Sequence, residues 1–135
     1  MGDCEKGGAQ NPVGWIEIPV SDIDRAEKFY TDYFGTVFER QPDKDGFKMS
    51  WLMPMDMELY GSGAMLTQGE GYTPSHEGAL LYFAAPEKGL KKAVQVAEEK
   101  GIKVLMPFMD IGEHGFIAFL EDSEGNRIGI HSMEA

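Results

Sequence analysis

The chain has few basic residues, one cysteine and no long hydrophobic run. Its 135 residues include 12 Lys and Arg against 23 Asp and Glu, so the formal net charge is −11. Such an acidic surface repels phosphate backbones and anionic lipids, and we expect no nucleic-acid partner and no membrane partner. No apolar stretch approaches the roughly 18 residues that a membrane span needs, and the N-terminus has no signal-peptide pattern. The default expectation is therefore a cytoplasmic protein.

The N-terminal segment 1–11, "MGDCEKGGAQN", is polar and rich in glycine. We expect it to be a disordered leader. It contains Cys4, the only cysteine, which cannot form an internal disulfide and lies in a poor setting for a catalytic nucleophile. The remaining residues, 12–135, fit one compact domain or two small halves that share a core.

The chain repeats one pattern of elements. "VGWIEIPV" (13–20) alternates like a strand, and "SDIDRAEKFYTDYFG" follows as a helix with Ser21 as the predicted N-cap and Gly35 as its end. "ALLYFAA" (79–85) begins the pattern again, with a helix predicted from Pro86 to Gly101. Three short strands are predicted after each helix, at 36–40, 46–53 and 57–66, and at 102–106, 115–121 and 126–132. The fold class is therefore α+β, with two tandem βαβββ modules at 12–68 and 76–132.

Each module would cover one face of its sheet with a helix and leave the other face open, so that two modules form a cup. Alternation along the strands assigns these residues to the helix side: Ile16, Ile18, Val20, Leu81, Phe83, Ile128 and Ile130. It directs these into the cup: Trp15, Glu17, Leu80, Tyr82, Arg127, Gly129 and His131. Inward-facing Glu17 and His131 are costly unless they are paired or hydrated, which makes the cup a candidate ligand site.

Two segments, "IPVSDIDRAEKFYTDYFG" and "DSEGNRIGIHS", together with the duplicated pattern, resemble the vicinal oxygen chelate superfamily. This superfamily includes glyoxalases, extradiol dioxygenases, fosfomycin resistance enzymes and bleomycin-binding proteins. The resemblance covers residues 13–132. It implies a cupped mixed β-sheet with helices on the outside, and a homodimer. It also implies a divalent metal in the cup, held by His, Gln or Glu on the first and last strands of each module.

The positions that correspond to those metal ligands carry unsuitable side chains. They are Trp15, Leu80, Gly129 and Ala64, or Met65 if the register differs by one residue. None of them binds a hard divalent cation through its side chain, so we predict no metal and no cofactor. Glu17 and His131 each lie two residues from such a position, and a displaced metal site built on them stays open as an alternative.

Several functions are compatible with this cup, and whether the protein is an enzyme is left open. The first hypothesis is a metal-free site for a small planar organic molecule, lined by Trp15, Glu17, Leu80, Tyr82 and His131. A second is a divalent-metal-dependent glyoxalase-like lyase or dioxygenase. A third is a metal-free enzyme that uses Glu17 and His131 as catalytic acid and base. A fourth is a dimeric interaction module that packs through methionine-rich strands.

Other polar residues are weaker candidates. Glu113 and His114 lie between glycines in a segment that we expect to be a mobile loop, and His76 lies in "TPSHEG". The pattern does not assign Trp51 to either face of its strand. No phosphate-binding glycine loop and no G-x-S-x-G signature occurs in the sequence.

Overall fold

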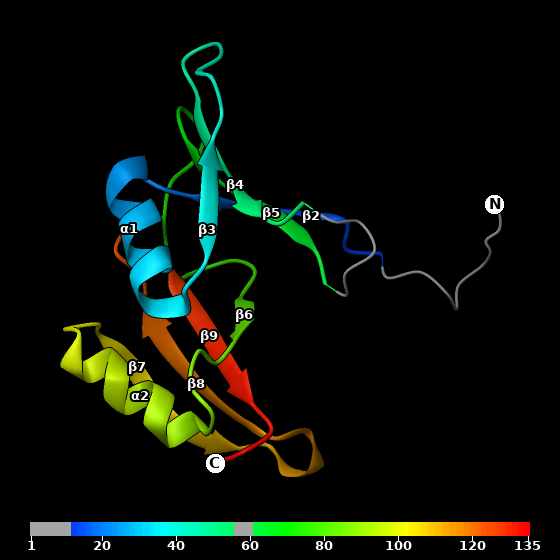
Figure 1. The fold of residues 1–135 in the computed structure, drawn as a ribbon, viewed down its shortest axis with the longest axis vertical. Helices are drawn as coiled ribbons and strands as arrows, with labels where there is room; N and C mark the ends of the chain where they lie inside the picture. Colours follow the sequence, from blue (N-terminus) through cyan, green and yellow to red (C-terminus); the bar gives the residue numbers. More distant parts are fainter. Residues whose placement is uncertain (1–11, 56–60) are drawn as a thin grey trace, which may run out of the picture.

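The computed structural model describes residues 12–55 and 61–135, so the leader 1–11 predicted to be disordered, with Cys4, lies outside the described residues. Figure 1 shows the order of the elements along the chain. The first module contains β2 (Trp15–Pro19), α1 (Ile23–Phe34), β3 (Val37–Arg40), β4 (Lys48–Met53) and β5 (Gly63–Gln68). The second contains β6 (Leu81–Ala84), α2 (Leu90–Glu99), β7 (Val104–Asp110), the 3₁₀ turn η2 (Gly112–His114), β8 (Phe116–Glu121) and β9 (Arg127–Ser132).

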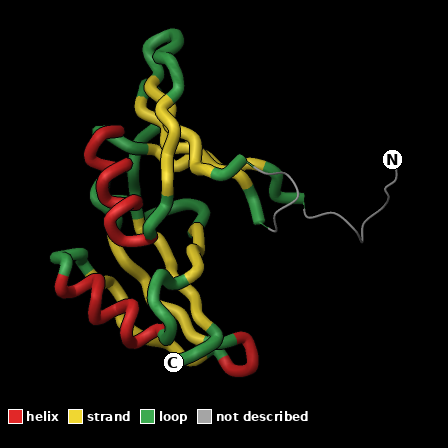
Figure 2. Tube along the Cα trace, viewed as in Figure 1, coloured by secondary structure: helices red, strands yellow, loops and turns green. Residues whose placement is uncertain are grey.

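The strands form two four-stranded sheets with the same topology, β2-β5-β4-β3 and β6-β9-β8-β7. In each sheet the first strand runs parallel to the last strand of its module, and the other neighbours are antiparallel. Both helices lie on one side of the molecule, as Figure 2 shows. Helix α1 packs on β3, β4 and β5, while α2 packs on β7, β8 and β9. The α+β fold of two βαβββ modules is confirmed. No helix in the described ranges is long and apolar enough to cross a bilayer.

Helix α1 ends where the sequence predicts but begins one residue later. Gly35 closes it in the left-handed conformation, with φ of 71°, as expected for a glycine at this position. The N-cap is Asp22 rather than Ser21, because the Asp22 side chain accepts a hydrogen bond from Arg25 N. The backbone N–H of Ser21 instead donates to the Glu124 carboxylate.

Helix α2 begins at Leu90, so the prediction of a start at Pro86 is wrong. Its N-cap is Gly89, with φ of 93° and no side-chain cap. The free N–H groups of Leu90 and Lys91 donate to the carbonyls of Glu134 and Ala135 at the end of the chain. A helix start that is satisfied by residues distant in sequence leaves no local capping signal.

The strands whose boundaries differ most from the prediction are β7 and β5. Strand β7 extends from 104 to 110 rather than ending at 106, and it keeps its pairing with β8 through irregular registers on either side of Met106. Strand β5 begins at Gly63 rather than at 57, and 57–60 lie outside the described residues.

The two modules share one hydrophobic core, and rings of α1 contact the second module. Ile18, Val20, Ile128 and Ile130 are buried, as their alternation predicts. The ring of Tyr30 in α1 lies 5.5 Å from that of Phe83 in β6, and Phe34 lies 4.6 Å from the same ring. Burial of aromatic rings between modules makes each module part of the other's core.

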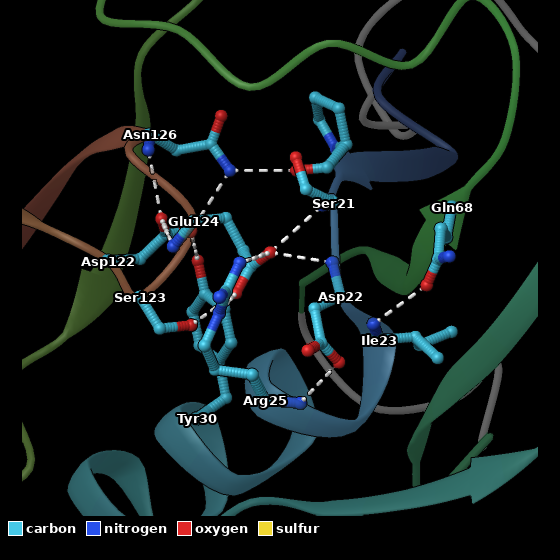
Figure 3. Close-up of polar contacts among 11 residues, drawn as sticks. Ser21, Asp22, Ile23, Arg25, Tyr30, Gln68, Asp122, Ser123, Glu124 and Asn126 are labelled. Carbon is cyan, nitrogen blue, oxygen red and sulfur yellow. Dashed lines mark hydrogen bonds and ion pairs between the residues drawn. The ribbon is translucent and has the colours of Figure 1, made fainter.

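A polar network also joins the modules, at the turn between β8 and β9 (Figure 3). The Asp122 carboxylate accepts hydrogen bonds from the Tyr30 hydroxyl at 2.5 Å and from Asn126. Glu124 accepts from the backbone N–H groups of Ser21 and Asp22 and forms an ion pair with Arg25 at 2.7 Å. The two segments that carry the family resemblance therefore contact each other, and the "DSEGN" turn is bonded to the start of α1.

Candidate ligand site on the open sheet faces

The open face of the first sheet is defined by the residues that alternate with the buried ones. Ser50 and Ala64 point to the core, with 0% and 5% of their surface exposed. Met49 and Trp51 therefore share the open face with Met65, and this assigns the face of Trp51 that the sequence left undetermined. Trp15 and Leu80 are corresponding positions of the two modules, so Glu17 and Tyr82, each two residues later, also correspond. Met65 pairs with Glu17 and Gly129 pairs with Tyr82, so Met65 rather than Ala64 is the equivalent of Gly129.

An aromatic ring lies over a glycine on each open face. A Cβ atom at Gly63 would lie 2.8 Å from Cζ3 of Trp15, and one at Gly129 would lie 2.5 Å from Cδ1 of Tyr82. Any side chain at these positions would displace the ring that covers them. Trp15 and Tyr82 still expose 41% and 44% of their surface. Trp15 and Tyr82, both predicted to line the site, therefore present an aromatic surface to solvent. The Tyr82 ring packed on Gly129 is the reason why this position has no room for a side chain.

Glu17 is held by a residue that the sequence did not indicate. The hydroxyl of Tyr72, in the segment between the modules, donates to Glu17 Oε1. This hydrogen bond raises the pKa of Tyr72, and the Tyr72 ring packs edge-to-face on Phe47 at 5.9 Å. A contact between a connecting segment and a strand depends on the path of the chain between them, which no short motif encodes.

His131 is held by the turn that precedes β8. Its Nε2 atom lies 2.7 Å from the carbonyl oxygen of His114. Because a carbonyl only accepts, Nε2 must carry the hydrogen, which leaves Nδ1 as the acceptor when the ring is neutral. Glu17 and His131 thus have different partners, and no hydrogen bond joins them in the part of the chain that the structure describes.

The first sheet also carries a pocket of about 330 Å³ beside the β3–β4 turn. Its lining comes from the turn and from β4: Gln41, Pro42, Asp43, Lys44, Met49 and Trp51. Thr67, the β5 partner of Met49, has a buried hydroxyl oxygen without a hydrogen-bond partner among the described residues. Apolar walls with a few polar groups are the usual composition of a small-molecule site.

The weaker candidates lie apart from these rings. His76 pairs with Glu121 at 2.6 Å. Glu113 and His114 lie 3.8 Å apart in η2, where both side chains are largely exposed. Leu80 is partly buried and directly precedes β6.

The side chains present do not fit the divalent metal that the resemblance implies. Trp15, Leu80, Met65 and Gly129 offer no oxygen or nitrogen ligand at the four corresponding positions. Across residues 12–55 and 61–135, no three His, Cys, Asp or Glu side chains lie close enough together to hold an ion.

Comparison with known proteins agrees with the geometry. Residues 13–130 match the family described as the Glyoxalase/Bleomycin resistance protein/Dioxygenase superfamily. The chain belongs to this superfamily. Proteins of known structure share its fold: trypanothione-dependent glyoxalase I of Leishmania major aligns with a TM-score of 0.66 and 24% identity, over 92% of this chain and 88% of the other. TnmS3, described as an antibiotic-binding protein from Streptomyces sp. CB03234, aligns with a TM-score of 0.65 and 22% identity, over 93% and 98% of the two chains.

Two curated relatives of the chain differ in length. The putative glyoxylase CFP32 of Mycobacterium bovis is 27% identical over 123 residues, which cover 90% of this chain and 45% of that protein. The chain thus spans about half the length of this relative. A glyoxylase-like domain-containing protein of Didymella fabae is 28% identical over 84% of this chain and 88% of its own length.

Proposed function

We propose that this protein binds a small, planar organic molecule on its open sheet faces without a divalent metal. The observation that carries the proposal is the pair of half-exposed rings, Trp15 and Tyr82, each laid over a glycine. Flat aromatic surface stacks on planar ligands, and the rings are held in place by the strands beneath them. Glu17, Leu80 and His131 would supply the remaining contacts.

The metal-dependent alternative receives no support from the donor set. A glyoxalase-like lyase or dioxygenase needs oxygen and nitrogen ligands at positions that here carry Trp15, Leu80, Met65 and Gly129. A protein that shares this fold is described as antibiotic-binding, so a binder is compatible with the fold. Fold alone does not decide between the two, and the side chains of the site carry the argument.

The acid–base alternative requires Glu17 and His131 to act on one substrate. Glu17 is bonded to Tyr72 and His131 to the His114 carbonyl, and no contact between the two residues favours their joint action. We therefore assign both residues to ligand contact rather than to catalysis.

We further propose that the protein is a homodimer. Trp15, Tyr82 and Met109 expose much of their apolar surface, and a second copy that packs near them would reduce this exposure. This second copy would also close the site from water.

Removal of both rings tests the proposed function. Calorimetric titration with 2-naphthamide, a neutral planar probe, is expected to show binding to the wild type and a loss of at least about tenfold in affinity in the Trp15→Ala/Tyr82→Ala double variant. Met133→Ala removes a side chain that is 62% exposed near the chain end and serves as the control, with affinity unchanged. Absence of binding to the wild type, or equal binding by the double variant, would contradict the proposal.

A further inference from the structure

Arg127, on the open face of the second sheet, has no ion-pair partner among the described residues. It is the first residue of β9, and its alternation with the buried Ile128 places it on the same face as Gly129 and His131. The other two arginines, Arg25 and Arg40, both pair with carboxylates. Arg127 is different, because its buried Nε–H has no acceptor within residues 12–55 and 61–135.

The acidic residue opposite Arg127 is already engaged. Glu121 is its cross-strand partner on β8, but the Glu121 carboxylate bonds to His76 at 2.6 Å. The Arg127 guanidinium instead lies over the Phe119 ring, with Cζ 5.6 Å from the ring centroid. A guanidinium stacked on a ring keeps its N–H donors in its own plane, where they can bind a second group.

The rings beside Arg127 form one cluster with it. Phe119 and Tyr82 are the two cross-strand neighbours of Gly129, one from β8 and one from β6. Their ring centroids lie 6.2 Å apart with the planes tilted by 55°. We name Tyr82, Phe119 and Arg127 the Arg127 cluster. It combines an exposed ring face with a cation that has free donors.

We infer that the molecule bound on the second sheet is an aromatic anion, with its ring on Tyr82 and its carboxylate on the Arg127 guanidinium. This inference rests on the proposed function and names the class of its ligand. A carboxylate accepts two parallel N–H bonds from a guanidinium, and such charge-assisted bonds are stronger than those to a neutral amide.

A pair of probes that differ only in charge tests the inference. Calorimetric titrations of the full chain with 2-naphthoate and 2-naphthamide share the same ring system. We expect 2-naphthoate to bind at least about tenfold more tightly than 2-naphthamide to the wild type. In Arg127→Met this preference is expected to disappear while the affinity for 2-naphthamide stays the same. Arg127→Lys, which keeps the charge but loses the fork of donors, is expected to retain only part of the preference.

Lys92→Met, at an exposed position of α2, is the control for net charge and should retain the full preference. Thermal unfolding of each variant verifies that the fold is kept. Equal affinity of the wild type for the two probes, or a preference that survives in Arg127→Met, would overturn the inference and leave the proposed function standing. If neither probe binds the wild type, the inference and the proposed function both fail.

Discussion

Replacing Asp122 with alanine is expected to lower the free energy of unfolding by about 3–5 kcal/mol. Only 5% of Asp122 is exposed, and its carboxylate accepts from the Tyr30 hydroxyl, from two donors of Asn126 and from the Glu124 backbone. The variant leaves the fully buried Tyr30 hydroxyl without its acceptor and frees the β8–β9 turn from α1. Urea unfolding followed by circular dichroism measures the change.

An exposed aspartate provides the matched control. Asp32 forms an exposed (i, i+4) ion pair with Lys28 on α1, so Asp32→Ala should leave the free energy of unfolding nearly unchanged. Tyr30→Phe, which removes one donor and keeps the ring, should cost about 1–2 kcal/mol. An Asp122→Ala protein as stable as Asp32→Ala would contradict the claim that the bonds between the β8–β9 turn and α1 stabilise the fold.

Replacing Glu124 with glutamine is expected to cost about 2 kcal/mol near neutral pH and progressively less in acid. Burial by itself would raise the pKa of Glu124, but hydrogen bonds from Arg25, Ser123 and the backbone of Asp22 and Ser21 outweigh it, so the pKa lies below the usual 4.5. Because its pKa is lowered in the folded protein, the ionised Glu124 carboxylate stabilises the folded state above pH 4.5. This stabilisation is lost as the pH falls through the pKa of Glu124 in the folded state. The difference between wild type and Glu124→Gln should therefore narrow below pH 4.5.

Unfolding curves at several pH values from about 7 to about 3 measure this narrowing. Burial would raise the pKa of Glu27, but its hydrogen bonds with Arg40 and Ser50 outweigh this effect and lower it. Glu27 is present in both proteins, so the difference between them isolates Glu124. A gap that stays constant from neutral pH into acid would contradict the assignment.

Local patterns predicted most of this fold, because alternation and capping act over a few residues. The strand faces around Ile18 and Ile130 and the end of α1 at Gly35 agree with the structure. The start of α2 does not, because its first N–H groups bond to the C-terminal residues Glu134 and Ala135. The N-cap of α1 shifts to Asp22 for a related reason: Glu124, about a hundred residues later in the chain, takes the Ser21 backbone N–H.

The candidate site was predictable to the same extent. Strand alternation was sufficient to place Trp15, Tyr82 and Gly129 on open faces, where the ring of Tyr82 lies over Gly129. The partners of Glu17 and His131 were not predictable, since Tyr72 and the His114 carbonyl come from connecting segments. The lack of an ion-pair partner for Arg127 among the described residues also depends on a distant contact, because His76 bonds to Glu121, the cross-strand neighbour of Arg127.

The central claim is that the open sheet faces hold an organic molecule without a divalent metal. The most direct test is calorimetric titration of 2-naphthoate into protein treated with EDTA and into protein incubated with Zn²⁺ or Ni²⁺, with metal content measured in parallel. The account predicts the same dissociation constant in all samples and no stoichiometric metal. Stoichiometric metal, together with binding that EDTA abolishes and Zn²⁺ or Ni²⁺ restores, would contradict it.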